Sequence, residues 1–261
     1  MTTSEYNIRG STAVVTGSSS GIGRAIGERF AKNGINVVIC SRSKEHVDPV
    51  ADAINDGNYE GEALPIECDV TNYGAIEDLV ETTTKTFGPI DILVNNAGAS
   101  FRSPFEDISK NGWQTIVDIN LHGAFNCSQV VGQQMRNGDG GTIINISSVA
   151  ARDGAPEMAH YAAAKSGMNN FTRTVAYEWA KYGIHVNGIM PGLVATEGLK
   201  SQMGISAEDI DEEEVDRQIG TPAEIASVAQ FLASPAARYI LGQTIAVEGV
   251  PRIARTRHHE N

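Results

Sequence analysis

Short runs of aliphatic residues alternate along the chain with longer segments whose hydrophobic positions recur every three or four residues. The aliphatic runs predict seven strands, at residues 12–17, 35–40, 63–70, 90–98, 141–148, 184–192 and 243–249. The helical spacing predicts helices over residues 23–34, about 111–135, about 157–181 and 222–234. Continuous Val and Ile runs are typical of strands covered on both faces, and strand–helix alternation is typical of parallel strands. The pattern therefore predicts one α/β domain over residues 1–261, a doubly wound parallel sheet with helices on both faces.

Composition and charge narrow the class of protein. The chain has 261 residues, 41% of them hydrophobic, and a formal net charge of −12. Such an acidic balance argues against nucleic acid or an anionic membrane as a partner. The three cysteines are widely spaced, which predicts reduced thiols and no metal site. The first residues, MTTSEYNIRGS, lack a signal-peptide pattern and no apolar run is long enough for a membrane span, so we expect a cytoplasmic protein.

A glycine-rich loop, TGSSSGIGR, joins the first predicted strand to the first predicted helix. Gly17 permits the tight turn, Gly21 allows close approach of the backbone, and Gly23 lets the helix pack on the strand. The N–H groups at the start of that helix then favour a pyrophosphate. A glycine pattern alone is weak evidence, but its place between a strand and a helix supports a dinucleotide site.

The end of the second strand bears on which dinucleotide binds. An acidic residue there would bind the ribose 2′-hydroxyl of NAD, whereas a basic residue would accept the 2′-phosphate of NADP. This chain has Ser41 and Arg42, and the Arg42 fork can bind a phosphate. NADP(H) is therefore favoured, with NAD(H) as the alternative. The alternative for Arg42 itself is a solvated loop residue with no ligand.

Four more features follow the later strands. NNAG (95–98) ends the fourth strand, Ser148 ends the fifth, and Pro-Gly (191–192) ends the sixth. Between the fifth and sixth strands, the segment AHYAAAKSG contains Tyr161 and Lys165, and Ser148 lies thirteen residues before Tyr161. With TGSSSGIG at the start, this set resembles the short-chain dehydrogenase/reductase family in its roughly 250-residue, Rossmann-like form, from about residue 10 to residue 250.

The resemblance implies a catalytic set of four residues. Tyr161 matches the general acid/base of the family. Lys165 matches the lysine that holds the nicotinamide ribose and lowers the pKa of the phenol. Ser148 matches the serine that orients the substrate oxygen, and Asn120, in DINLHGAF, matches the asparagine of a proton relay through water. The chemistry is reasonable, because residues i and i+4 share a helix face and a nearby ammonium favours a phenolate. The alternative for Asn120 is a polar residue on a helix surface.

The resemblance also implies the residues that bind the cofactor. They are Gly17, Ser19, Ser20, Gly21, Ile22, Gly23, Arg42, Asp69, Val70, Asn96, Ala97, Gly98, Tyr161, Lys165, Pro191, Gly192, Val194 and Thr196. One departure is Ser20, because relatives that use NADP often have a basic residue there. Another is residues 197–220, the lid segment, which is acidic and lacks the usual Pro-Leu-Gly-Arg ending.

Several other polar residues have alternative interpretations. Ser147 is the rival of Ser148, but neighbouring residues of a strand point to opposite faces, so we expect only one to reach the site. His160 should project about 100° away from Tyr161, which favours a supporting or packing role. The acidic run from Glu208 to Asp216 is interpreted as a solvated face and not as a metal site. His258 and His259 belong to a C-terminal tail, residues 251–261.

The predicted reaction is hydride transfer between the nicotinamide and a carbonyl or secondary alcohol. A 3-oxoacyl thioester or similar ketone is favoured as substrate, and a sugar or polyol is the close alternative. Arg102 or Arg152 could meet an anionic group of the substrate. A different class, a dinucleotide-binding sensor or scaffold without turnover, would be expected to lack part of the catalytic set. The resemblance also implies a homotetramer or homodimer.

Overall fold

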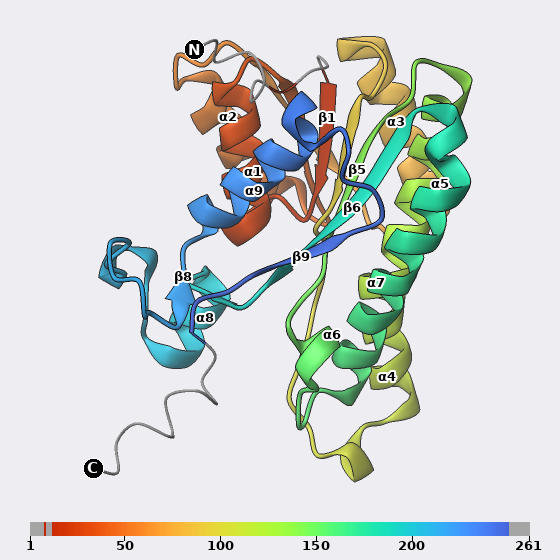
Figure 1. The fold of residues 1–261 in the computed structure, drawn as a ribbon. Helices are drawn as coiled ribbons and strands as arrows, with labels where there is room; N and C mark the ends of the chain where they lie inside the picture. The colour runs from red at the N-terminus through yellow and green to blue at the C-terminus, as the bar shows by residue number, and fades with distance from the viewer. Residues whose placement is uncertain (1–7, 9–11, 251–261) are drawn as a thin grey trace.

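A parallel seven-stranded sheet forms the centre of the molecule in the computed structural model, which describes Ile8 and residues 12–250 (Figure 1). The strand order is β3-β2-β1-β4-β5-β6-β9. The strands are β1 (Thr12–Thr16), β2 (Asn36–Ser41), β3 (Ala63–Glu67), β4 (Ile92–Asn95), β5 (Gly141–Ile146), β6 (Ile184–Pro191) and β9 (Thr244–Val247). The chain winds outward from β1 in one direction and then from β4 in the other, so the order reverses between these two strands. In such sheets ligands bind at the carboxyl ends, near the reversal.

Helices cover both faces of the sheet, as the pattern predicts. One hydrophobic cluster joins the sheet to α1 (Gly21–Lys32), α2 (Lys44–Asn55) and α9 (Pro222–Ala233). The other cluster joins it to α3 (Tyr73–Phe87), α5 (Gly123–Asn137) and α7 (Ala159–Trp179). The prediction of a single doubly wound α/β domain is confirmed.

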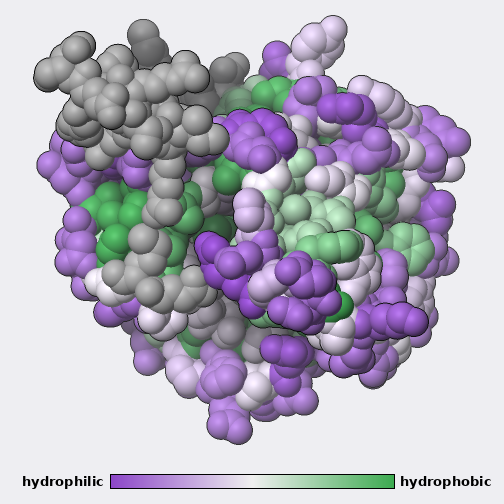
Figure 2. Space-filling model, turned by 90° about the horizontal axis from the view of Figure 1, so that it is seen from below, coloured by the Kyte–Doolittle hydropathy of each residue, from purple (hydrophilic) through white to green (hydrophobic). Residues whose placement is uncertain are grey.

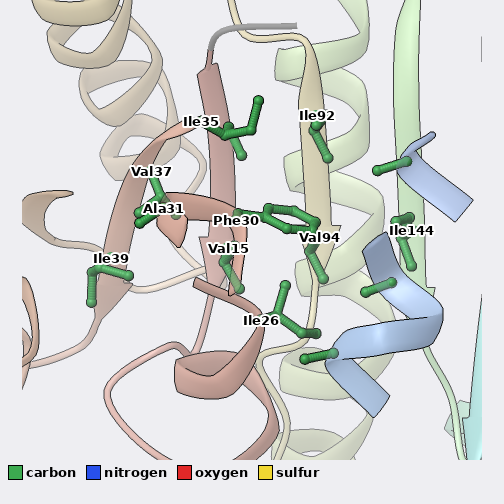
Figure 3. Close-up of a cluster of buried hydrophobic side chains, with 14 of the residues drawn as sticks. Val15, Ile26, Phe30, Ala31, Ile35, Val37, Ile39, Ile92, Val94 and Ile144 are labelled. Carbon is green, nitrogen blue, oxygen red and sulfur yellow. The ribbon is translucent and has the colours of Figure 1, made fainter. Parts of the chain in front are cut away.

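Successive residues of β1 serve the two clusters in turn. Val15 packs in the first cluster, beside Phe30 of α1 and Val94 of β4, whereas Val14 belongs to the second (Figure 3). All of these side chains are almost completely buried. Burying a Val or Phe side chain contributes about 1.5–3 kcal/mol each, so the two faces hold the strand ends in fixed positions.

The structure differs from the predicted elements at three helices. Helices α2 and α3 are additional to the predicted set. The apolar residues of α2 have helical spacing, but Pro49 inside the helix argued against it in the sequence. Helix α3 is rich in threonine, which has a low helix propensity. The predicted helix over 111–135 is divided into α4 (Lys110–Val117), a π-helical turn (Asp118–His122) and α5.

Smaller elements gather at the carboxyl end of the sheet. Helix α6 (Ala150–Asp153) follows β5, and a two-stranded pair, β7 (Leu193–Val194) with β8 (Ile219–Gly220), follows β6. Helix α8 (Glu197–Met203) and a 3₁₀ turn (Ala207–Asp209) lie in the lid segment. Within residues 12–250, no helix has the length and apolar character needed to cross a bilayer.

Candidate active site

A cavity of about 570 Å³ opens at the carboxyl ends of the strands. Its walls come from the loops after β1, β2, β3, β4, β5 and β6, together with the π-helical turn, α7 and the starts of α1 and α8. Every residue predicted for the catalytic set lines it, and so does every predicted cofactor residue except Gly23. At this end of the molecule, hydrophobic residues form patches that hydrophilic residues surround (Figure 2). Residues distant in sequence therefore meet around one space.

The glycine loop is joined to the loop after β4 by hydrogen bonds. The Asn96 side-chain amide donates to the carbonyl oxygens of Thr16 (2.9 Å) and Gly17 (3.0 Å). In return, the Thr16 hydroxyl oxygen accepts from the backbone N–H groups of Asn96 and Ala97, each at 3.0 Å. Gly17 has φ +63°, and a Cβ there would lie 2.8 Å from the Ala97 Cα. A side chain at position 17 would separate the two loops.

The start of helix α1 suits an anionic group. Ser20 is the N-cap but its side chain makes no capping hydrogen bond, and the first turn contains no acidic residue. The N–H groups of the first turn have no partners within the helix, and they attract negative charge. Gly21, with φ +54°, lines the cavity at this point. The local geometry fits the pyrophosphate of a dinucleotide.

Gly23 has a different place from the other loop glycines. It is the one predicted cofactor residue that does not line the cavity. A Cβ at this position would collide with the Asn96 side-chain nitrogen and lie 2.5 Å from the Gly17 carbonyl oxygen. The bare backbone of Gly23 thus allows close packing beneath the loop, against Gly17 and Asn96.

The far end of the cavity combines an exposed arginine with a partly buried aspartate and a buried valine. Arg42 lies at the surface directly after β2, and Asp69 and Val70 follow β3. Asp69 accepts hydrogen bonds from the backbone N–H (2.9 Å) and the hydroxyl (2.8 Å) of Thr71. These bonds use one carboxylate oxygen and hold the loop. The end of β2 presents a guanidinium and a serine to the cavity but no carboxylate, as the sequence indicated.

Tyr161, Ser148 and Lys165 lie together at the other end. The Ser148 hydroxyl lies close enough to the Tyr161 phenol to lower its pKa, and it accepts a hydrogen bond from the Ala150 backbone N–H, at 3.2 Å. The Lys165 ammonium donates to the carbonyl oxygen of Ile146, at 2.8 Å, and lies 5.7 Å from the centre of the Tyr161 ring. Lys165 is only 3% exposed. The bond to Ile146 fixes the lysine against the end of β5.

Burial governs the pKa values of this pair. It raises the pKa of Tyr161, and the nearby Ser148 hydroxyl only partly opposes this. It also lowers the pKa of Lys165 to about 8. The expectation that the ammonium would bring the pKa of Tyr161 below its ordinary value is therefore not met in this structure. Removing the phenol from water disfavours the phenolate more than its neighbours favour it.

Asn120 is held by the π-helical turn between α4 and α5. Its side-chain amide donates to the carbonyl oxygens of Ala99 (2.7 Å) and Ile116 (2.9 Å). Its side-chain oxygen is buried without a hydrogen-bond partner, and a Cβ on Gly98 would lie 2.8 Å from it. The side chain is completely buried. Asn120 is thus a cavity residue and not a polar residue of a helix surface.

The prediction that only one of the two serines reaches the cavity is wrong. Ser147 and Ser148 both line it, because β5 ends at Ile146 and the alternation of side chains ends with it. The two hydroxyls nevertheless differ. The Ser147 hydroxyl donates to the Lys165 carbonyl oxygen, at 3.4 Å, while the Ser148 hydroxyl lies near the Tyr161 phenol and lowers its pKa. Ser148 keeps its predicted place.

His160 has a structural contact beside the site. Its Nδ1 accepts a hydrogen bond from the Tyr161 backbone N–H, at 2.7 Å, and its ring packs edge-on against Phe101 with the ring centres 4.2 Å apart. The side chain is completely buried, and burial lowers its pKa. These contacts support the α7 end that carries Tyr161, in agreement with the predicted supporting role.

The two arginines considered for an anionic substrate already have carboxylate partners. Arg102 pairs with Glu157 at 3.3 Å, and Arg152 pairs with Asp153 at 2.6 Å and Glu248 at 2.7 Å. Their positive charge is therefore offset locally. Across the described part of the chain, His, Cys, Asp and Glu side chains form no group that could hold a metal ion.

Some wall residues were not among the predicted catalytic and cofactor-binding residues, although Ser100 and the start of the lid segment were expected to shape the substrate pocket. They are Ser41, Cys68, Ala99, Ser100, Ile119, Ile146, Ser147, Glu197 and Gly198. Most lie next to a predicted residue at a strand end, so their position in the sequence was a usable signal. Ile119 precedes Asn120 in the π-helical turn, and no pattern in the sequence indicated that turn.

Comparison with known proteins agrees with this geometry. The family model described as enoyl-(acyl carrier protein) reductase matches residues 17–249. The chain is 40% identical over 240 residues to a 3-oxoacyl-[acyl-carrier-protein] reductase of Synechocystis, covering 91% of this chain and 95% of that protein. It is 36% identical to a NAD-dependent glycerol dehydrogenase of Listeria innocua, over 94% of this chain and 95% of that one.

A solved structure is similar over nearly the whole chain. It is a gluconate 5-dehydrogenase from Burkholderia cenocepacia in complex with NADP and tartrate, with a TM-score of 0.84 and 32% identity. The match covers 94% of this chain and 96% of that one. This protein therefore belongs to the short-chain dehydrogenase/reductase family of oxidoreductases.

The buried ammonium should make the fold less stable at neutral pH. Because the pKa of Lys165 is about 8 in the folded chain and about 10.4 when unfolded, the cost is fully present below pH 8 and disappears as the pH rises through 10.4. Lys165→Met should therefore raise the free energy of unfolding at pH 7, by up to about 3 kcal/mol, with a smaller gain above pH 9. Urea unfolding across pH 7–10 measures this.

The exposed Lys85 gives the matched control, because Lys85→Met should leave the pH dependence of stability unchanged. A Lys165→Met protein that is less stable than the parent at every pH would show that the bond to Ile146 outweighs the burial cost.

Proposed function

We propose that this protein transfers a hydride between the nicotinamide of NADP(H) and a carbonyl or secondary alcohol carbon. The observation that supports this most is the shared cavity: Ser148, Tyr161, Lys165 and Asn120 line the space that also contains the glycine loop. A dinucleotide whose pyrophosphate rests at α1 would extend towards these four side chains. The arrangement suits a reaction in which carbon receives a hydride and oxygen receives a proton.

Each of the four residues has a role in this proposal. The bound nicotinamide supplies or accepts the hydride. Tyr161 and Ser148 hold the substrate oxygen, and Tyr161 gives its proton to that oxygen as the alcohol forms. Lys165 holds the nicotinamide ribose, and its charge lowers the cost of forming the phenolate. The unpartnered Asn120 oxygen holds a water through which Tyr161 recovers its proton.

The raised pKa of Tyr161 favours proton transfer from the phenol to the substrate oxygen, which is the direction of carbonyl reduction. A phenol that holds its proton at neutral pH is a competent acid for carbonyl reduction. Alcohol oxidation needs the phenolate, and it should require a higher pH. Lys165, with a pKa of about 8, is mostly protonated at pH 7 and can stabilise the developing phenolate.

NADP(H) is the proposed cofactor, and Arg42 is the main reason. Its exposed guanidinium follows β2 at the cavity wall, where a 2′-phosphate would lie, and no carboxylate at the end of β2 opposes a phosphate. NAD(H) is the alternative, since Ser20 supplies no second positive charge. The other cofactor contacts proposed are those named from the sequence, except that Gly23 acts through packing.

For the substrate, we favour a 3-oxoacyl thioester or similar ketone. The similarity to the Synechocystis 3-oxoacyl-[acyl-carrier-protein] reductase supports this choice. The similarity to the glycerol dehydrogenase and the gluconate 5-dehydrogenase favours a sugar or polyol as the second candidate. A sensor or scaffold without turnover is disfavoured because the catalytic set is complete. Turnover of ketones with NADPH would indicate the first candidate and turnover of polyols with NADP⁺ the second, whereas a sensor or scaffold would turn over neither.

We further infer a homotetramer, or a homodimer, in the cytoplasm. Exposed aromatic residues on α5 and α7, among them Phe125 and Tyr177, support association through the long helices. The lid segment is proposed to cover the substrate, because Glu197 and Gly198 at its start line the cavity. Sedimentation measures the assembly.

Replacing the phenol tests the proposed proton donor. Tyr161→Phe should lower kcat by about 10²–10⁴-fold, the range that a general acid contributes, and leave NADPH affinity nearly unchanged. Stopped-time turnover assays and fluorescence titration of NADPH measure the two quantities. Tyr239→Phe, at a fully exposed tyrosine, is the control and should behave as the parent. Turnover by Tyr161→Phe at the parental rate would refute this role.

Charge reversal at the end of β2 tests the cofactor preference. Arg42→Asp should weaken NADPH binding by roughly 10–100-fold, because it removes a charge-assisted pair and adds repulsion, while NADH binding changes little. Isothermal titration with both cofactors measures the ratio. Lys85→Asp, far from the cavity on α3, controls for the change in net charge. Equal losses for both cofactors would remove Arg42 from the phosphate site.

A further inference from the structure

A second cavity, of about 330 Å³, lies beside the active site, and we call it the tail groove. Its apolar walls come from β7, β8 and β9, including Leu193, Ile219 and Val247, and its rim contains Glu212 and Glu214. Val194 lines both this groove and the active-site cavity. Whatever fills the groove therefore lies behind one wall of the active site.

The rim of the groove is strongly acidic and partly apolar. Residues 207–216 contain seven Asp or Glu residues and no Lys or Arg, and two of the seven, Glu212 and Glu214, line the groove. Arg217 also lines it, but its guanidinium is paired with Glu224. Val215 lies among them on the rim and is 92% exposed. An exposed valine between carboxylates suits an occupant that has both positive charge and an apolar side chain.

The chain itself leads to this groove. Gly249 lines it, and the Val250 backbone N–H donates to the Arg217 carbonyl oxygen, at 3.0 Å. The eleven residues that follow, PRIARTRHHEN, lie outside the described residues. They contain three arginines, two histidines, one glutamate and one large apolar residue, Ile253. The charge of this tail is thus opposite to that of the groove rim.

We propose that the tail, residues 251–261, docks in the tail groove of its own chain. Ile253 is three residues beyond Val250, a span of at most roughly 10–11 Å, so it can reach Val215 from the groove edge. Arg252 and Arg255 flank Ile253 and meet Glu212 and Glu214. The docked tail fastens residues 207–217 against β7 and thereby steadies the lid segment beside the active site.

A pair of engineered cysteines tests where the tail lies. In the full-length Val215→Cys/Ile253→Cys protein, mild oxidation should form a bond within one chain, seen on a non-reducing gel as a faster band of monomer mass. The native cysteines Cys40, Cys68 and Cys127 are buried and should not compete. A band of dimer mass would overturn docking in the same chain, and absence of any cross-link would overturn docking itself. Each single-cysteine protein is the control.

A charge swap tests what holds the tail. Arg252→Glu/Arg255→Glu should make limited proteolysis within residues 207–217 about three- to tenfold faster, because two ion pairs become repulsive and the segment opens more often. Glu212→Arg/Glu214→Arg should do the same. Combining the four changes should restore slow cleavage, since the pairs re-form with opposite sign.

The cleavage assay needs no turnover, so its outcome is independent of the proposed reaction. The protein that lacks residues 251–261 should be cleaved within residues 207–217 as fast as the Arg252→Glu/Arg255→Glu protein. Its cleavage should not become faster in 1 M salt, which screens ion pairs. Cleavage at the parental rate in the truncated protein would contradict the proposal, as would a combined variant no slower than either double variant.

Discussion

The active site depends on one junction, where the sheet order reverses between β1 and β4. There Asn96 donates to both Thr16 and Gly17, and the Thr16 hydroxyl accepts from two backbone N–H groups of the opposite loop. These bonds set the distance between the glycine loop and the loop that leads to Asn120. Each of these hydrogen bonds contributes about 0.5–1.5 kcal/mol to stability, but their main effect is to fix the relative positions of the two loops. The N-terminus of α1 and the catalytic side chains face the same space because this junction holds.

Burial is the second constraint, and it opposes stability while serving the chemistry. Lys165 has its ammonium against the Ile146 carbonyl oxygen with almost no exposure, a position that would be more stable with an apolar residue. The same position holds the ammonium 5.7 Å from the centre of the Tyr161 ring, at the end of the cavity where the proposed chemistry takes place. The fold is therefore less stable with Lys165 buried than it would be with an apolar residue there, and the buried ammonium is kept because the proposed reaction uses it.

Much of the fold and site could be predicted because parallel strands bring their carboxyl ends to one edge. Ser148 and Asn96 were placed by their positions at the ends of aliphatic runs, whereas Asp69 was named through the family resemblance. The pKa of Tyr161 could not be predicted, because it depends on how completely neighbouring elements bury the phenol. The partners of Arg102 and Arg152 depend on loops that approach only in three dimensions. The π-helical turn at Asn120 likewise has no signature in hydrophobic spacing.

The most direct test of the proposed hydride transfer is to follow a deuterium label from NADPH into the product. A ketone that the enzyme reduces is converted with NADPH that is deuterated at the reactive face of C4, in ordinary water, and the alcohol is examined by mass spectrometry and NMR. Direct hydride transfer predicts one deuterium on the carbinol carbon of every product molecule. Unlabelled product from this reaction, or carbon-bound deuterium from D₂O with ordinary NADPH, would contradict the account.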